Sequence, residues 1–388
     1  MKTFLSSRER LLCSFRHEQP DHVPLWLLWR NNGMSFNCLD EIGRVEASLE
    51  MGVDDSVLLH PPGPREDDLV TNALLAPATS TTMVQHEDGQ PYPLITRSYM
   101  TTDGNLRQIV RKTDDWPFGG DIPLFTDYSV SRAREHLIKG HADCAALKHI
   151  LKSPTSDQLK EFKERGRTFR TFAHNKGVLF EGGWTYSADA AVWLVGLDIL
   201  VQKALEEPDF VQELLEIIYA WESVRINLLI EEKVELITHS AWYEMPYLWS
   251  PNLYRLFIKP ILMRMIGQCH DAGIPFCYIL TAGSSMIIDD LLEMGVDAIR
   301  GIDPLMGKND DLALLKKGLG HRIALWGGVN SAITLGRGSR EDIVTAVDQA
   351  MDILAPGGGF VLHPVDAIYN DTPMENFRIF IDQWKIRA

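Results

Sequence analysis

The chain has 388 residues, a length that fits one (β/α)8 barrel with insertions. Hydrophobic residues make up 45% and charged residues 23%, which excludes a disordered, collagen-like or coiled-coil chain. The net charge is −15, from 53 acidic and 38 basic residues, so we expect no nucleic-acid partner. The five cysteines form no Cys-x-x-Cys pair, and no apolar run is long enough for a signal peptide or a membrane span. We therefore expect a cytoplasmic protein with no membrane partner.

The amino-terminal segment predicts a short helix followed by a buried strand. Ser6 and Glu9 have the spacing of a capping box, in which each side chain accepts a hydrogen bond from the other residue's backbone N–H. The segment 18–24, which contains two prolines, then ends the helical pattern, and the apolar run Val23–Trp29 begins at its end.

Short apolar runs recur along the chain, and amphipathic segments of helical length separate those of the second half. This pattern is typical of βα units with a buried parallel sheet. The eight runs are Val23–Trp29, Ser56–His60, Val178–Glu181, Glu235–His239, Ile274–Leu280, Val296–Ile299, Arg322–Trp326 and Gly359–His363. Their number predicts a closed (β/α)8 TIM barrel.

Capping residues, prolines and glycines elsewhere in the chain predict helix starts and one insertion. Ser250-Pro251 and Ser339 are suited to cap helices that end near Gly273 and Gly357. Between about 61 and 176 the βα pattern weakens, and residues 99–105 predict a β-hairpin turn. We expect a single domain over 1–388 with an N-terminal extension and an insertion or lid at about 61–176.

Polar residues at the carboxyl ends of the predicted strands are candidate site residues, because active sites of such barrels lie there. They are Arg30, Asn31, His60, Glu181, His239, Glu244, Thr281, Asp303, Asn330, His363 and Asp366. Histidines and carboxylates that converge on one opening are suited to acid/base chemistry or metal binding. The alternative interpretation of each residue is loop hydrogen bonding, since strand ends need partners.

Tryptophans form the second candidate group. Trp26 lies within a predicted strand, which favours core packing. Trp184, Trp242 and Trp249 follow predicted strands and could line a pocket for a flat aromatic ligand. Gly327-Gly328 fits no phosphate-binding motif, and it predicts instead a close approach of backbone to a ligand or a tight turn.

Several segments resemble the uroporphyrinogen decarboxylase superfamily. They are Ser7-Arg-Glu-Arg-Leu-Leu, Gln19-Pro-Asp-His-Val-Pro, Ser250-Pro-Asn-Leu-Tyr-Arg-Leu-Phe-Ile-Lys-Pro, Leu292-Glu-Met-Gly-Val-Asp-Ala-Ile, Trp326-Gly-Gly-Val-Asn and Thr372-Pro-Met-Glu-Asn-Phe. They occur in the family's order at both ends of the chain. The resemblance implies a (β/α)8 barrel independently of the strand count.

Departures from the family's motifs separate its branches. Decarboxylases carry a segment like P-V-W-F-M-R-Q-A-G-R, whereas residues 24–33 here contain one arginine and lack the Q-A-G-R portion. Thiol methyltransferases of the family carry a zinc motif H-x-C-G and a later cysteine. The corresponding positions here are Leu280–Gly283 and Asp366, which lack the sulfur ligands. The resemblance therefore favours the cobalamin-dependent methyltransferase branch that demethylates methoxylated aromatics, and it leaves zinc open.

The resemblance implies that a methyl group passes from a small methoxylated aromatic substrate to the cob(I)alamin of a partner corrinoid protein. The catalytic set is expected to act as an acid or to bind the ether oxygen, and the remaining residues are expected to contact the substrate. The catalytic set is Glu181, His239 and Glu244, and the substrate-binding set is His60, Trp184, Trp242, Asp303, Asn330, His363 and Asp366. A decarboxylase of the uroporphyrinogen type, with Arg30 and Arg300 as cationic partners, and a non-catalytic small-molecule-binding barrel stay open as alternatives. The oligomeric state also stays open.

Overall fold

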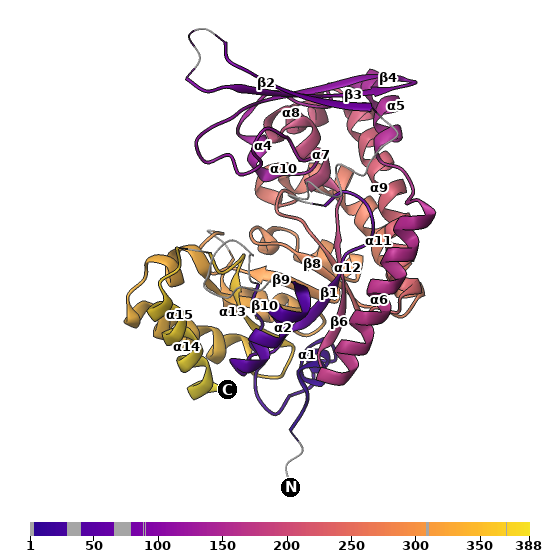
Figure 1. Ribbon diagram of the computed structural model, residues 1–388. Coiled ribbons are helices and arrows are strands. Elements are labelled where there is room, and N and C mark those ends of the chain that lie inside the picture. Colours follow the sequence, from indigo (N-terminus) through magenta and orange to yellow (C-terminus); the bar gives the residue numbers. More distant parts are fainter. Residues whose placement is uncertain are drawn as a thin grey trace.

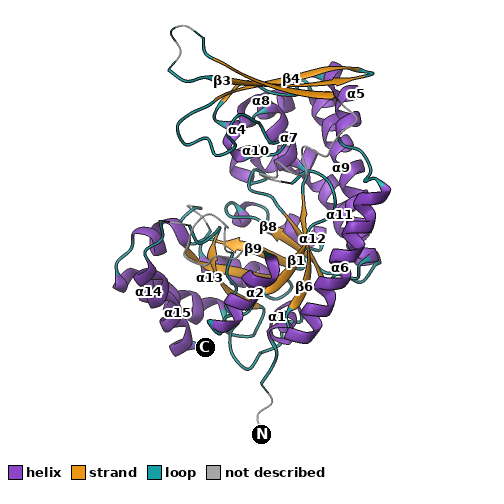
Figure 2. Ribbon diagram, in the orientation of Figure 1, coloured by secondary structure: helices purple, strands orange, loops and turns teal. Residues whose placement is uncertain are grey.

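The computed structural model describes residues 4–28, 40–65, 79–87, 89, 91–307, 310–369 and 371–388. A curved sheet of parallel strands forms its centre, in the order β1-β6-β7-β8-β9-β10-β11 (Figures 1 and 2). The strands are β1 (Ser56–Leu59), β6 (Leu179–Thr185), β7 (Leu236–His239), β8 (Phe276–Ile279), β9 (Ala298–Ile302), β10 (Ala324–Asn330) and β11 (Phe360–Val365). Seven of the eight predicted runs thus form neighbouring strands.

The first predicted run connects the two edges of this sheet. Leu25 forms a parallel bridge with Leu362 of β11, and Trp26 forms one with Asp54, which lies just before β1. The N–H of Trp26 donates to the carbonyl oxygen of Leu362 at 3.0 Å. In the described residues the run is therefore a pair of bridges rather than a full strand, and it completes the barrel.

Helices surround the parallel strands and extend beyond them toward one end of the molecule (Figure 2). They are α1 (Ser7–Phe15), α2 (Glu41–Glu50), α4 (Asp127–Val130), α5 (His141–Ile150), α6 (Ser156–Lys176), α7 (Ala188–Val195), α8 (Leu197–Glu206), α9 (Pro208–Glu231), α10 (Pro246–Leu253), α11 (Lys259–Asp271), α12 (Ile288–Met294), α13 (Leu312–Leu319), α14 (Arg340–Leu354) and α15 (Met374–Arg387). The larger apolar core lies between these helices and the strands, and a smaller one lies inside the barrel against Leu11 of α1. α1 therefore closes the amino-terminal end of the barrel.

The predicted helix starts are confirmed. Ser6 and Ser339 each accept a hydrogen bond from the N–H three residues on, and both form capping boxes. Ser250 has a φ of 59°, and the helical backbone that begins at Pro251 continues to Asp271, close to the predicted end. Helical backbone also precedes it from Pro246, which the sequence did not indicate.

An antiparallel sheet lies within the segment predicted to be an insertion. Its strands are β2 (Thr79–Gln85), β3 (Leu94–Thr101), β4 (Gly104–Arg111) and β5 (Ala133–Glu135). β3 and β4 form the predicted hairpin, with Thr102 and Asp103 between them. The sheet lies on the side of the molecule opposite α1, beyond α7, α8 and α10 (Figure 1). α6 falls within the same predicted range, yet it packs against β1 and β6.

Two strands extend further than the sequence predicted. Glu181 and His363 were expected just beyond their strands, but β6 continues to Thr185 and β11 to Val365. The reason is that Gly182-Gly183 and Pro364 keep extended backbone, although glycine and proline often mark strand ends. Arg30 and Asn31 lie outside the described residues. No helix in the described ranges is long and apolar enough to cross a membrane.

Gly327 of β10 packs against the backbone of β9. The register between these strands shifts between Trp326 and Gly327, and a Cβ at Gly327 would lie 2.3 Å from the carbonyl oxygen of Ile302. Gly327 and Gly328 continue β10 instead of forming a tight turn, and the close approach here is to the backbone of the neighbouring strand. We expect Gly327→Ala to lower the free energy of unfolding by about 3 kcal/mol, because the backbone must move to relieve this overlap.

Thermal or denaturant unfolding measures this effect, with Gly267→Ala in α11 as the control. A Cβ at Gly267 meets no atom within 4 Å, so this variant should gain about 0.5–1 kcal/mol from its helical propensity. Equal midpoints for the two variants would contradict the packing described for Gly327.

Candidate active site at the carboxyl end of the barrel

A buried ion pair lies inside the barrel. Glu181 accepts hydrogen bonds from the hydroxyl of Ser56 at 2.6 Å and the hydroxyl of Thr238 at 2.5 Å. Nη2 of Arg300 lies 3.1 Å from Oε1 of Glu181, and both side chains are buried. These contacts join β1, β6, β7 and β9, so the charged pair ties together strands from different parts of the barrel.

Aromatic rings cover the guanidinium of Arg300. Its central carbon lies 4.2 Å from the ring centroid of Trp26 and 4.5 Å from that of Trp326. Cations are attracted to the faces of such rings. Within the described residues, Nε and Nη2 of Arg300 donate no hydrogen bond. Arg300 was considered only for the decarboxylase alternative, and its pairing with Glu181 was not predicted.

His363 lies beside this pair. Its Nδ1 donates to the carbonyl oxygen of Trp26 at 3.1 Å, and its ring packs edge-on against Trp26. Burial, and then the positive charge of Arg300, lower the pKa of His363 to about 3. His363 is therefore neutral at physiological pH. With Glu181 and Arg300 it forms what we call the barrel floor, which lies above the apolar layer of Leu179, Leu236, Cys277, Ala298 and Val361.

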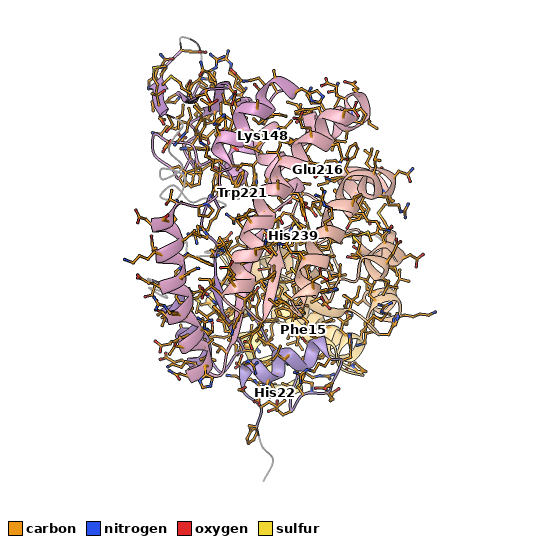
Figure 3. The ribbon with its side chains drawn as sticks, turned by 90° about the vertical axis from the view of Figure 1, so that its right-hand side faces the viewer. Phe15, His22, Lys148, Glu216, Trp221 and His239 are labelled. Atoms are coloured by element: carbon orange, nitrogen blue, oxygen red, sulfur yellow. The ribbon has the colours of Figure 1, made fainter. Side chains whose placement is uncertain are left out.

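His239 points away from the barrel interior. Thr238 contacts Glu181 inside the barrel, and successive strand residues point to opposite faces. The ring of His239 accordingly stacks on Phe276 and Tyr278, in the layer between strands and helices. Figure 3 shows it between the end of the molecule marked by Phe15 and the end marked by Lys148.

Glu244 joins His239 in this outer layer. Nε2 of His239 lies 3.2 Å from Oε1 of Glu244, and Nδ1 lies 2.8 Å from the hydroxyl of Thr185. Tyr278 donates to Oε2 of Glu244 at 3.0 Å. The structure thus brings two of the expected catalytic residues together and places Glu181 on the other face of the sheet.

The sequence did not single out Asp189, a buried carboxylate beside this pair. Asp189 lies in the first turn of α7 and accepts the hydroxyl of Ser240 and the N–H groups of Trp242 and Tyr243. Burial, and next the charge of Glu244, raise the pKa of Asp189 to about 7. A correct end of β6 at Thr185 would have pointed to this residue, since Asp189 then follows the strand closely.

Three candidate residues carry ring nitrogens without hydrogen bonds. In the part of the chain that the structure describes, Nδ1 of His60 and Nε1 of Trp184 and Trp242 are buried yet have no partner. Their residues follow or end β1, β6 and β7, which are neighbours in the sheet. Trp184 is half-buried and packs against the larger apolar core, beside the register shift between Gly182 and Thr185 of β6.

Positive charges surround His60. Burial, and then Arg65, Arg165 and Arg225, lower the pKa of His60 well below its usual range. Arg225 also donates to the carbonyl oxygens of Pro62 at 3.1 Å and Trp184 at 3.3 Å, so it fixes the ends of β1 and β6. His60 is therefore neutral, and its ring can accept a hydrogen bond but cannot act as a strong acid.

The remaining candidates bind neighbouring loop atoms. Asp303 accepts the N–H of Leu305 at 2.7 Å and the side-chain amide of Asn330 at 2.6 Å. Asn330 in turn accepts the N–H of Ile333, and Asp366 accepts the hydroxyl of Tyr369. Thr281 donates to the sulfur of Met245 at 3.5 Å. These contacts agree with the interpretation that strand-end polar residues fix loops.

The described residues offer no group of three or more His, Cys, Asp or Glu side chains that could hold a metal ion. Thr281 and Asp366 occupy the positions where the family's zinc motif and its later cysteine were expected, and their contacts are those given above. The donor set does not fit a zinc ion, and we derive no step through one.

The fold and the polar groups inside it are those of an α/β barrel with a candidate site at its carboxyl end. Residues 133–385, more than half of the chain, match the uroporphyrinogen decarboxylase (URO-D) family. The chain therefore belongs to this family, as the sequence motifs predicted.

Curated relatives match only part of the chain. A uroporphyrinogen decarboxylase from Actinobacillus succinogenes is 26% identical over 132 residues, which cover 34% of this chain and 35% of that protein. The methylcobamide:CoM methyltransferase MtaA from Methanosarcina barkeri is 24% identical over 206 residues, or 52% of this chain and 55% of that protein. The matches thus span about a third and about half of these relatives.

A solved structure agrees over almost the full length. A methyltransferase from Methanosarcina mazei superposes with a TM-score of 0.60 and 18% identity, covering 98% of this chain and 99% of that one. At this identity the likeness establishes the shared fold.

Neutral His363 gives a test of the barrel floor. Between pH 6.5 and about 3 the unfolded chain binds a proton at this residue that the folded chain does not, so stability falls as the pH drops below 6.5. We expect His363→Asn to remove about 2 kcal/mol of the stability lost between pH 7 and pH 5. Urea unfolding across this range measures it.

The exposed His174 of α6 supplies the control, because His174→Asn should keep the wild-type pH dependence. If wild type and His363→Asn lost the same stability between pH 7 and pH 5, His363 would take up its proton as readily in the folded protein as in the unfolded chain, which would contradict its lowered pKa.

Proposed function

We propose that this protein is a corrinoid-dependent methyltransferase that accepts its methyl group from a small methoxylated aromatic compound. The similarity to two proteins named as methyltransferases supports the reaction class. The observation that carries the substrate class is the set of buried ring nitrogens of His60, Trp184 and Trp242 that lack partners among the described residues.

A buried donor without an acceptor costs about 1–3 kcal/mol, and an acceptor that a ligand supplies would offset this cost. An aryl ether oxygen is such an acceptor, and indole faces suit the ring that carries it. Trp184 and Trp242 are half-buried at adjacent strand ends, where they leave ring surface for a ligand. We therefore assign both indoles to the wall of the pocket for this ring, with the N–H at the edge of Trp242 as the donor to its oxygen.

The reaction breaks the bond between the methyl carbon and the aryl oxygen, and the electron pair stays on the oxygen. The methyl carbon bonds to an electron pair of the reduced cobalt, which a partner corrinoid protein brings as second substrate. The resulting phenolate then takes up one proton. Positioned N–H donors stabilise the charge that develops on this oxygen, because they need no reorganisation during the reaction.

The residues of the site divide between these tasks. His60, held neutral by burial and the arginines around it, accepts a hydrogen bond from a hydroxyl beside the ether oxygen. Of the expected catalytic residues, Glu181 lies inside the barrel, where it accepts hydrogen bonds and pairs with Arg300, so we assign it to the floor of the site and the return of the proton to solvent. His239 and Glu244 lie on the other face of the sheet, and we assign them to support of the site.

An anaerobic assay tests this function. The purified protein is mixed with free cob(I)alamin and a panel of methoxylated aromatics, and the corrinoid spectrum reports methylation. We expect methylation with at least one donor, and faster methylation when the corrinoid is bound to its carrier protein. A negative result with every donor, with free and with carrier-bound corrinoid, would favour the decarboxylase or the binding-protein interpretation.

Removal of one indole N–H tests the role of the tryptophans. Trp242→Phe keeps an aromatic ring but loses its donor, so we expect kcat/KM for the aromatic donor to fall about 10- to 100-fold. Trp116→Phe is the matched control, because its N–H already donates to the carbonyl oxygen of Asp121 in the antiparallel-sheet segment. Unchanged kcat/KM in Trp242→Phe would remove this donor from the mechanism.

A further inference from the structure

Two carboxylates tie together the loops that follow β6 and β7. Asp189, on the β6 side, accepts the hydroxyl of Ser240 at 2.9 Å and the N–H groups of Trp242 at 3.0 Å and Tyr243 at 2.8 Å. Glu244, at the end of the β7 loop, reaches back in the opposite direction. We call Asp189 and Glu244 together the loop clasp.

The return contacts of Glu244 complete the loop clasp. Its Oε1 accepts the N–H of Ala188, the first residue of α7, at 3.0 Å, and also the hydroxyl of Ser187. A carboxylate at a helix amino terminus is favoured by the helix dipole. Each loop thus supplies the acceptor for backbone N–H groups of the other, so neither loop can shift alone.

The loop clasp is anchored to the sheet behind it. Tyr278 of β8 donates to Glu244 at 3.0 Å, and Tyr254 donates to the hydroxyl of Tyr278 at 3.3 Å. His239 bridges Glu244 and the hydroxyl of Thr185 at the end of β6. The backbone on each side of the opening is therefore fixed by one connected set of buried polar groups.

This set positions both tryptophans of the candidate site. The backbone N–H of Trp242 donates to Asp189. Trp184 directly precedes Thr185, whose hydroxyl contacts His239. Asp189 and Glu244 are both fully buried, although two carboxylates so close together repel each other. Buried charges are costly unless well paired, which indicates that this arrangement serves geometry rather than stability.

We propose that Asp189 is a positioning residue that sets the place of Trp242 relative to Trp184 and thereby determines which aromatic donors fit. The inference rests on the proposed function, because it assigns the region beside the two indoles to the methyl donor. Asp189 touches neither substrate, and it acts through the N–H groups of Trp242 and Tyr243.

The test uses Asp189→Asn in the full-length protein. The new amide places an NH2 group against backbone donors, so at least one of the three hydrogen bonds is lost. Without any ligand, we expect hydrogen exchange at the amides of Trp242 and Tyr243 to accelerate at least about 10-fold, while exchange in β8 and β9 stays at the wild-type rate. Unchanged exchange at these two amides would overturn the proposal.

Kinetics test the consequence for the substrate. We expect the KM for the aromatic donor to rise about 10-fold in Asp189→Asn, while kcat and the KM for the corrinoid acceptor change less than about two-fold. Loss of folded protein alone would instead lower the apparent kcat and leave both KM values unchanged. Faster loop exchange with an unchanged donor KM would overturn the role of Asp189 in donor selection.

Two further variants keep the result interpretable. Ser240→Ala removes one hydrogen bond to Asp189 without changing a charge, and it replaces Asp189→Asn if that variant folds poorly. We expect Ser240→Ala to show the same changes in exchange and donor KM at a smaller size. Asp290→Asn is the control, because this buried carboxylate of α12 pairs with Arg255 and Lys259 instead of a loop amide. It should leave the exchange at Trp242 and the donor KM unchanged.

The two proposals can fail separately. If none of the aromatic donors leads to corrinoid methylation by the wild-type protein, the proposed function and the donor site beside the indoles are both wrong. The exchange measurement then still decides whether Asp189 holds Trp242. If the wild-type protein turns over a donor and Asp189→Asn behaves like it, the proposed function stands and the role of Asp189 is rejected.

Discussion

The ion pair between Glu181 and Arg300 is the constraint on which the interior of this barrel depends. Removing one partner of such a buried pair leaves an uncompensated charge and costs about 3–5 kcal/mol. The surrounding residues follow from this requirement. Ser56 and Thr238 satisfy the carboxylate, and Trp26 and Trp326 cover the guanidinium. The barrel therefore has a polar middle layer above an apolar one, and this layer forms the floor of the candidate site.

Consecutive residues of one strand serve different purposes at this site. Thr238 faces the barrel interior and donates to Glu181, whereas His239 faces the helices and contacts Glu244. The inner face thus carries the groups beneath the opening, and the outer face carries the groups that hold the loops around it. Because the two sets share the backbone of β7, a change on the outer face alters the geometry of the inner one.

Local signals in the sequence predicted most of the fold. The capping residues Ser6 and Ser339, the hairpin at 99–105 and seven of the parallel strands follow from spacing and apolar runs, and the structure contains them. The ends of the strands were harder to predict from the sequence. Gly182-Gly183 reads as a turn, yet it continues β6, so Glu181 was expected at the opening and lies inside the barrel instead.

The partners of the candidate residues could not be predicted, because they depend on contacts between distant segments. Arg300 has no local feature that indicates its pairing with Glu181 or its position between two indoles. The role of Asp189 likewise depends on the backbone N–H groups of the next loop, which its own sequence neighbours do not indicate. Alternation along β7 would have separated Thr238 from His239, but only if the face of one of them had been known.

The closed amino-terminal end of the barrel has a kinetic consequence. α1 packs there against β6 and β11, and Phe15 reaches the ring of Trp326 at a centroid distance of 6.0 Å. If the protein acts as we propose, the methyl donor and the protein-bound acceptor share the opening at the carboxyl end. The proposal then implies an ordered reaction, in which the small donor binds first and the carrier protein second. The docked carrier would cover the opening, retain the donor and exclude bulk water until the methyl group has moved.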